Sequence, residues 1–492
     1  MGFYTLWAAI PTSSGSFYSP DSLRNSLRAI ENIYHRRGYN DVFTSFRVVL
    51  DTPNALAHLT FQITEGRQSF IESIEIEGYQ RTSLRFVTRQ LDLETGDVLN
   101  FEKINEGRRR LYATGVYSTV DFQTEEIVGN NADPARKNMR VRLRLRENAP
   151  YRLQYGLFYD TDRGPGGIVE AQSLNVMGRA SNLGVRLRYD AELREGRLYY
   201  RQPYIRDLHL KMDVVAFAQQ EIRAAYSARR IGFSLTQERA LPRAFRLDYG
   251  YRYDHVRWEP EHVVFNPTIF QANVPVARLT ATLTRDKRDH VLDATRGEFS
   301  AHTLEFGPRL LGSEIGFARY SGQYFRYVPL DKFLKLPTRD TEGNPLPARF
   351  VYAGAMRLGA TSSFAGRELI SPERFFAGGG TTMRGFDQDM LGPLVTYDDG
   401  KLRPKGGEGL FIFNNEIRFP IRGVLHGVGF LDIGNIYPRL RDFDFSMRKT
   451  VGAGIRLKTS FLPPLRFDYG FQLDRQTGEP SRAFFFSIGQ AF

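Results

Sequence analysis

The sequence predicts a mainly β protein, in which small modules that mix helices and strands precede a transmembrane antiparallel β-barrel of about 16 strands. Up to residue 149 apolar residues recur at both helical and strand spacing, and from Tyr151 onward they alternate with polar residues at every second position. No uncharged apolar run approaches the roughly 18 residues that a membrane-spanning helix needs. These observations exclude a helical membrane protein but allow a barrel, because barrel strands average to a polar sequence.

Composition narrows the classes of function. The 492 residues contain no cysteine, which excludes a disulfide scaffold, a thiolate metal site and a cysteine nucleophile. The formal charge of +12 is compatible with a nucleic-acid partner, but the arginines occur singly at alternate positions, as in segment 185–189 (VRLRY). This spacing favours a solvated or barrel-lining face over a basic patch, so we expect no nucleic-acid partner.

Two modules are expected before the barrel, at residues 1–67 and 68–149. The first has a predicted helix at 20–37, with an apolar stripe along one side, and strands at 42–50 and 57–63. The second has the predicted order β-α-α-β-β, with elements at 71–76, 84–91, 101–114, 119–122 and 139–145.

The two modules contain a repeat. Segment 96–101 (GDVLNF), a helix and then Gly115-Val116-Tyr117 match segment 15–20 (GSFYSP), a helix and Gly38-Tyr39. On this alignment the first module begins at its second helix. We therefore expect residues 1–67 to be a partial module that lacks native N-terminal sequence.

The barrel is expected at residues 150–492. Tyr151, Leu153, Tyr155, Leu157 and Tyr159 share one face of a predicted strand, and stretches near 183–192 and 245–254 alternate in the same way over the length that a tilted membrane strand requires. Alternation alone also fits a soluble β-sandwich. The abundance of tyrosine and phenylalanine on the apolar faces and the lack of helices to cover an open sheet favour a barrel. The chain length allows about 14, 16 or 18 strands.

A glycine-rich segment, 375–386 (FFAGGGTTMRGF), is the strongest motif. It lacks the Gly-Lys-Ser/Thr of a phosphate-binding loop and has no parallel α/β context. A flexible connection between strands would explain the glycines, but it would leave Arg384 unexplained.

This segment resembles the loop of the BamA/TamA superfamily of outer-membrane assembly proteins, which carry β-α-α-β-β POTRA modules ahead of a sixteen-stranded barrel. The resemblance implies that a loop at 375–392 folds into the lumen, with Gly378, Gly379, Arg384, Gly385 and Phe386 as its functional residues.

The same resemblance implies that the arginine pairs with acidic residues on nearby strands of the barrel wall. Segment 414–420 (NNEIRFP) is similar to the family strand that carries the glutamate, here Glu416, and segment 430–435 (FLDIGN) to the strand that carries the aspartate, here Asp432. If Leu431 and Ile433 face lipid, alternation places Asp432 in the lumen. An arginine can bind such carboxylates in a bidentate manner that a lysine cannot reproduce.

The last strand, 484–492 (FFFSIGQAF), resembles the C-terminal barrel signal of outer-membrane proteins, with Phe486, Ile488, Gly489 and Phe492 as the residues that carry the signal. In the family, the seam between the first and last strands is where clients are thought to enter. The resemblance covers nearly the whole chain and leans toward the TamA-like branch.

Other motifs carry no chemistry. Segment 160–164 (DTDRG) superficially resembles a calcium loop, but its fifth residue is Gly164 and Pro165 follows where glycine is required, so a hairpin turn is expected. The eight histidines lack local metal-ligand spacing. We expect no metal, no cofactor, no catalytic residue and no enzymatic activity.

The sequence therefore predicts an assembly factor in the bacterial outer membrane with its POTRA modules in the periplasm. The expected partners are unfolded outer-membrane clients, outer-membrane lipid and a periplasmic or inner-membrane accessory protein. The alternative is a secretion pore of the two-partner type, which shares the plan of modules and barrel. A passive barrel would make the modules and Arg384 superfluous.

Overall fold

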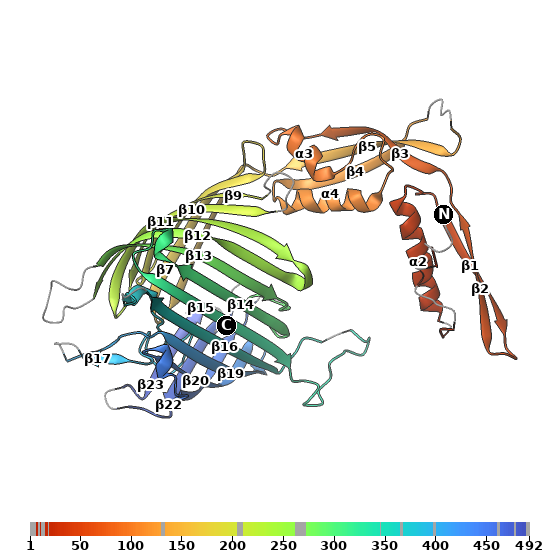
Figure 1. The fold of residues 1–492 in the computed structure, drawn as a ribbon. Coiled ribbons are helices and arrows are strands. Elements are labelled where there is room, and N and C mark those ends of the chain that lie inside the picture. Colours follow the sequence, from red (N-terminus) through yellow and green to blue (C-terminus); the bar gives the residue numbers. More distant parts are fainter. Residues whose placement is uncertain are drawn as a thin grey trace. The chain divides into compact units, whose positions relative to one another are not determined.

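The computed structural model describes residues 6–7, 10, 15–17, 19–128, 133–203, 210–260, 272–344, 346–364, 368–396, 400–459, 463–476 and 479–488. The chain divides into two compact units. The first comprises Met1–Tyr151 and Ser173–Ser181, and the second comprises Arg152–Gln172 and Asn182–Phe492. Figure 1 labels the elements of both units.

The first unit begins with an amphipathic helix and a hairpin. Helix α2 (Pro20–Arg36) buries Leu23, Ile30 and Tyr34 on one side, as the apolar stripe in the sequence predicts. Strands β1 (Phe43–Asp51) and β2 (Leu56–Thr64) pair only with each other among the described residues, and they form a two-stranded antiparallel sheet.

A three-stranded sheet and two helices follow in the same unit. Their order is the predicted β-α-α-β-β: β3 (Gln68–Glu77), α3 (Leu84–Leu91), α4 (Phe101–Ala113), β4 (Tyr117–Glu126) and β5 (Arg136–Glu147). In the sheet β5 lies between the other two strands, parallel to β3 and antiparallel to β4. The core is formed by buried apolar residues of the helices and of β5, among them Val87, Leu91, Ile104, Leu111, Val141 and Leu143.

The carboxylate of Glu147, at the end of β5, organises one end of this unit. It accepts hydrogen bonds from the backbone N–H groups of Gln80, Arg81 and Thr82 at 3.2, 3.2 and 2.9 Å. The Thr82 hydroxyl and the Arg81 guanidinium also donate to it, at 2.7 and 3.0 Å. Burial raises the pKa of this carboxyl, but the bonds from Thr82 and Arg81 outweigh burial and lower the pKa to about 2.

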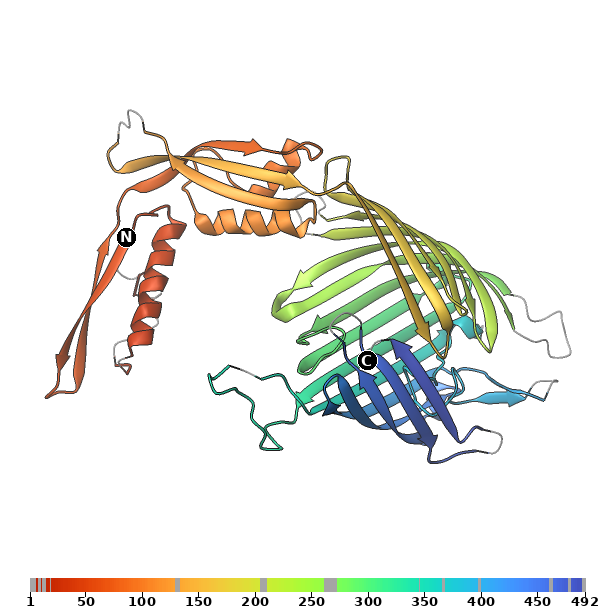
Figure 2. The ribbon, with the colours of Figure 1, turned by 180° about the vertical axis from the view of Figure 1, so that it is seen from behind.

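The second unit is a closed barrel of sixteen strands, so the predicted fold class is confirmed. Strand β11 runs antiparallel to β12, and β22 runs antiparallel to β23. Figure 2 shows the barrel from the side on which its first strands (yellow) and last strands (dark blue) lie. In barrel order the strands are β6 (Tyr151–Asp160), β7 (Gly164–Val176), β8 (Ser181–Tyr189), β9 (Leu193–Gln202), β10 (Lys211–Ile222), β11 (Tyr226–Leu241), β12 (Phe245–Pro260), β13 (Ala272–Asp286), β14 (Gly297–Gly307), β15 (Gly316–Pro329), β16 (Val351–Phe364), β19 (Gly409–Arg422), β20 (Leu425–Tyr437), β21 (Arg448–Leu457), β22 (Leu465–Gln472) and β23 (Arg482–Ile488).

The apolar positions of the barrel strands face outward. Leu157 is 89% exposed, and Leu187 and Ile231 are exposed as well. The lumen instead holds buried charged residues, such as Asp254 and Asp432. This inverted distribution matches the alternation in the sequence and is the one that a lipid-facing wall requires. Within the described residues, no helix combines the length and the apolar character needed to cross a membrane.

Two boundaries differ from those expected. The turn at Ser173–Ser181, between β7 and β8, belongs to the first unit, because Ser83 donates its backbone N–H to the carbonyl of Gly178 and Asn175 donates its amide to the Thr82 hydroxyl. The glycine-rich loop is also longer than residues 375–392. It lies between β16 and β19 and includes the short pair β17 (Leu394–Thr396) and β18 (Leu402–Pro404).

Replacing Glu147 by Gln is expected to lower the free energy of unfolding of the first unit by up to about 3 kcal/mol at pH 7. The pKa of Glu147 is depressed in the folded state, so its contribution is complete above the unfolded pKa of about 4.3 and is lost as the pH falls toward 2. Urea titrations of the full chain at several pH values, followed by the helical circular dichroism signal, measure this free energy of unfolding. The exposed Glu72→Gln is the control, and equal stability of Glu147→Gln and wild type at pH 7 would contradict the expectation.

Candidate functional site

The connection from β16 to β19 folds into the barrel lumen around a small apolar core. Phe375, Met383, Phe386 and Leu391 of the loop pack with Ile412 and Ile436 of the wall. Two of the glycines that were predicted to be functional permit this backbone path. Gly379 and Gly385 have φ of 88° and 101°, in the left-handed region that favours glycine.

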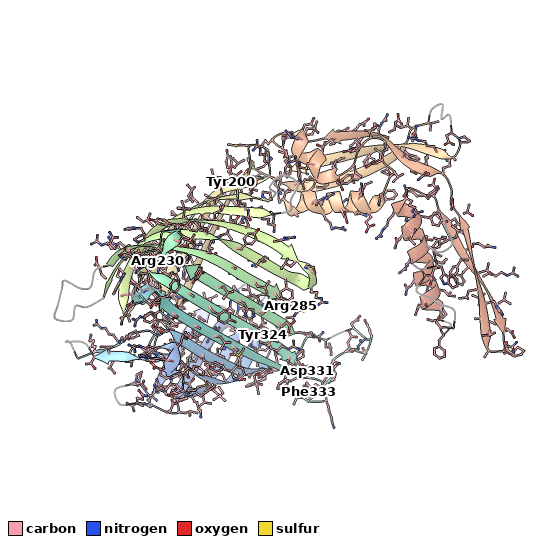
Figure 3. All side chains as sticks on the ribbon, viewed as in Figure 1. Tyr200, Arg230, Arg285, Tyr324, Asp331 and Phe333 are labelled. Carbon is pink, nitrogen blue, oxygen red and sulfur yellow. The ribbon has the colours of Figure 1, made fainter. Side chains whose placement is uncertain are left out.

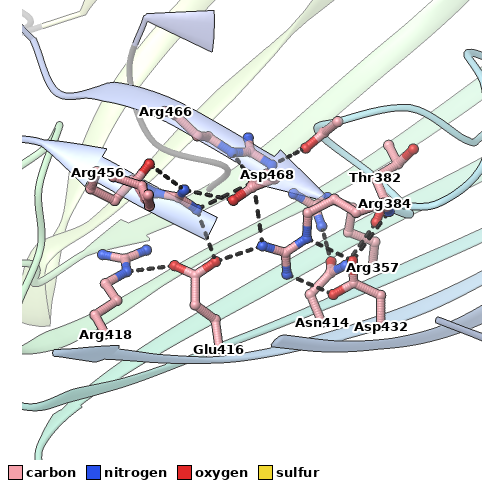
Figure 4. Close-up of polar contacts among 12 residues, drawn as sticks. Arg357, Thr382, Arg384, Asn414, Glu416, Arg418, Asp432, Arg456, Arg466 and Asp468 are labelled. Carbon is pink, nitrogen blue, oxygen red and sulfur yellow. Dashed lines mark hydrogen bonds and ion pairs between the residues drawn. The ribbon is translucent and has the colours of Figure 1, made fainter. Parts of the chain in front are cut away.

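Arg384 is 1% exposed and binds two wall carboxylates (Figure 4). Its Nε and Nη2 donate to the two oxygens of Asp432 at 2.8 and 2.7 Å. Its Nη1 donates to Oε2 of Glu416 at 2.8 Å, and its backbone N–H donates to Asp432 at 3.2 Å. The guanidinium carbon also lies 3.6 Å from the centre of the Phe430 ring. The structure therefore brings together the three charged residues that the sequence pointed to.

The pair of carboxylates belongs to a larger buried network, which the sequence analysis did not identify. Arg418 donates to the second oxygen of Glu416 at 2.6 Å. Asp468 of β22 lies 3.7 Å from Nη1 of Arg384 and accepts hydrogen bonds from Arg456, at 2.6 Å, and from Arg466. The alternation that places Asp432 in the lumen also applies to Asp468, between Phe467 and Tyr469, and it could have identified this residue.

The network holds the loop against the barrel wall as a clamp. Burying a guanidinium is costly unless it is paired and hydrogen-bonded, and here the fixed fork of Arg384 fits Asp432 in a bidentate manner. Removing a partner would leave an unpaired buried charge. Among the described ranges, no three His, Cys, Asp or Glu side chains are placed to hold a metal ion.

The remaining predicted residues have defined places where the structure describes them. Gly378 has φ of 122°, and a Cβ there would lie 2.3 Å from the carbonyl oxygen of Asp387. The ring of Phe386 is buried and lies under the Arg448 guanidinium, 4.8 Å away. Phe486 packs against Tyr159 of β6, and Ile488 pairs with Leu465 of β22. Gly489 and Phe492 lie outside the described residues.

Glu373, upstream of the glycines, is a second anchor that the sequence analysis missed. It is 1% exposed and accepts a bidentate pair of bonds from Arg278 of β13, at 2.9 and 3.0 Å. Arg230 of β11, labelled in Figure 3, donates to it at 2.8 Å and to Asp254 at 2.9 Å. The strands that hold Glu373 are distant, in the barrel order, from the strands that hold Arg384.

Asp389, downstream of the glycines, is a third anchor. Arg223, which follows β10, donates to both of its carboxylate oxygens at 3.0 Å. No local pattern marks Glu373 or Asp389, because Glu373 ends a short 3-10 helix (Ser371–Glu373) and Asp389 lies in a turn, where the side-chain alternation of strands does not apply. Only their distant partners give them a role.

The chain matches known protein families. Residues 175–492 match the Omp85 superfamily domain, and residues 4–66 and 69–148 each match the surface antigen variable number repeat, POTRA. The outer membrane protein assembly factor BamA of Nitratidesulfovibrio vulgaris is 22% identical over 486 residues, covering 97% of this chain. The chain spans 58% to 63% of the length of the curated BamA relatives that it matches.

Solved structures share the fold. BamA from Haemophilus ducreyi lacking POTRA domains 1–3 has a TM-score of 0.74 at 20% identity, with 97% of this chain and 95% of that chain covered. CdiB from Acinetobacter baumannii has a TM-score of 0.52 at 15% identity, with 99% and 86% covered. The lean toward the TamA-like branch stays a prediction.

Replacing Arg384 by Ala is expected to release the loop while the barrel still folds, because removing one partner of a buried ion pair costs about 3–5 kcal/mol. Cleavage by chymotrypsin after Phe386, which is buried in the wild type, should rise at least about tenfold, since cleavage follows the population of the open form. Heat-modifiability on a gel reports whether the barrel is folded.

Arg246→Ala is the matched control, because Arg246 pairs with Asp248 in an exposed setting. Arg384→Lys should fall between Ala and wild type, since lysine keeps the charge but cannot form the bidentate pair. Unchanged protection of Phe386 in Arg384→Ala would show that the clamp does not hold the loop.

Proposed function

This chain belongs to the Omp85 superfamily, and from that membership and the character of its barrel seam we propose that it is an assembly factor for outer-membrane proteins. It lies in the outer membrane with the POTRA modules in the periplasm. It receives unfolded β-barrel or autotransporter-type clients and templates their insertion at the seam. Its function is non-enzymatic, because strand pairing supplies the driving force and no covalent step is required.

The exposure of the first barrel strand, beside the last one, is the observation that carries the proposal. Among the described residues, β23 and β6 share one registered pair, Ser487 with Asp160. Backbone contact at the seam adds a bond from the Thr161 N–H to the Phe486 carbonyl at 3.0 Å.

A weakly paired strand offers free N–H and C=O groups to another chain. Strand β6 resembles such an edge. Side chains on both of its faces are exposed, including Gln154, Tyr155 and Leu157. An incoming client strand can pair with this edge by β-augmentation, with the main chain supplying the affinity. The mode needs no particular client sequence beyond strand character.

The modules supply a second set of edges. Strands β1 and β2 form a sheet of two strands, so each has an unpaired side among the described residues, and β3 and β4 are the outer strands of the other sheet. Extended clients can pair there before they reach the barrel. Outer-membrane lipid surrounds the apolar wall, and a periplasmic or inner-membrane accessory protein is the further partner proposed for the modules.

Reconstitution tests the function. The full chain in liposomes should accelerate the folding of urea-unfolded outer-membrane proteins over empty liposomes by about tenfold, which corresponds to about 1.4 kcal/mol in the barrier. The heat-sensitive gel shift of folded barrels follows the reaction. Arg384→Ala should lose most of the acceleration, and Arg246→Ala should keep it.

Two outcomes of this experiment would change the proposal. Client folding at the rate of empty liposomes, together with ion conductance through the reconstituted chain, would favour the secretion pore of the two-partner type. Acceleration that survives Arg384→Ala would keep the assembly role but remove the loop from it.

A further inference from the structure

The hairpin turn between β6 and β7, which only superficially resembles a calcium loop, contacts the lumenal loop. The backbone N–H of Gly380 donates to Oδ2 of Asp162 at 2.9 Å. The Asp162 carboxylate therefore ties the tip of the loop to the first hairpin of the barrel. Asp162 is not one of the residues that anchor the loop in the site described above.

The carbonyl group of Gly380 faces the last strands of the barrel. Its carbonyl oxygen accepts a hydrogen bond from Nη2 of Arg466 on β22. A Cβ placed on Gly380 would lie 3.2 Å from the Phe485 ring of β23. One loop residue thus contacts the first hairpin and the last two strands, which are the two sides of the seam.

The neighbouring glycine makes room for the carboxylate. A Cβ on Gly379 would lie 2.9 Å from Oδ2 of Asp162 and 2.3 Å from the side chain of Gln388. Asp162 therefore occupies space that any other residue at position 379 would need. This explains the glycine run beyond the backbone angles, because the loop must approach the hairpin closely.

The contact is also connected to the arginine clamp. Arg466, which holds the Gly380 carbonyl, donates through Nε to Asp468, and Asp468 lies 3.7 Å from Nη1 of Arg384. A continuous set of polar contacts therefore runs from the wall carboxylates through the loop tip to Asp162.

We propose that Asp162 is a positioning residue that latches the tip of the lumenal loop across the seam. With the loop seated, Gly380 bridges the first hairpin and the last two strands of the sheet. When the loop leaves, the bridge is lost and β6 becomes free to separate from β23. The consequence for clients rests on the proposed function, since it makes the loop a gate for strand entry.

Distance measurements between spin labels test the latch in the full chain. The sequence has no cysteine, so Leu157→Cys on β6 and Phe471→Cys on β22 label the two sides of the seam at exposed positions. In liposomes, Asp162→Ala should raise the ratio of the long-distance to the short-distance population about tenfold. That change is the effect of losing one charge-assisted hydrogen bond.

Two variants separate the latch from a general effect on the turn. Asp162→Asn keeps an acceptor oxygen for the Gly380 N–H, so this variant should keep most of the short-distance population. Arg163→Ala, in the same turn, removes ion pairs at 3.8 Å to Asp160 and Glu192 and should leave the distances unchanged. An unchanged distribution in Asp162→Ala, or an equal change in Arg163→Ala, would overturn the proposal.

A second substitution approaches the latch from the loop. Gly380→Val should displace the tip from Phe485 and reproduce the longer distances, and this keeps the test decisive if Asp162→Ala does not fold. The client-folding assay on the same liposomes separates the two proposals. Longer distances with no acceleration in the wild type would retain the latch and remove the assembly role. Acceleration with unchanged distances would retain the assembly role and remove the latch.

Discussion

The barrel interior depends on one buried guanidinium. Arg384 is withdrawn from water, and its charge is compensated because two carboxylates from adjacent strands meet it with bonds of 2.7 to 2.8 Å. Buried ion pairs contribute little net stability compared with apolar packing, so position is the better reason for this one. A fork that binds Asp432 in a bidentate manner fixes both the place and the orientation of the loop.

The same logic extends along the loop. Glu373, Arg384 and Asp389 are each held by side chains from a different part of the wall. Three charged anchors at separate places allow few alternative positions, because any shift would leave several buried charges unpaired at once.

This arrangement has a consequence for the sheet. A closed barrel has no free edge, and its least protected place is the junction of its first and last strands. Here that junction has one registered pair among the described residues, and the loop adds polar contacts from the lumenal side. The free energy of seating the loop and that of closing the seam are thus linked through shared contacts.

The class of fold was predictable from the amino-acid pattern, and a family resemblance pointed to the residues of the central clamp. Alternation at every second position is a local property, and it assigned Glu416 and Asp432 to the lumen once a barrel was inferred. The β-α-α-β-β order followed from periodicity in the same way. The resemblance in segment 375–386 then selected Arg384 among many arginines.

Which distant residues meet depends on the folded barrel. Asp162 and Gly380 lie 218 positions apart, and Glu373 reaches Arg278 and Arg230 from a short 3-10 helix in the loop. Alternation tells which face a side chain takes, but it does not tell the register or the partner across the lumen. Closure of the sheet brings these residues together, and closure is a property of all sixteen strands at once.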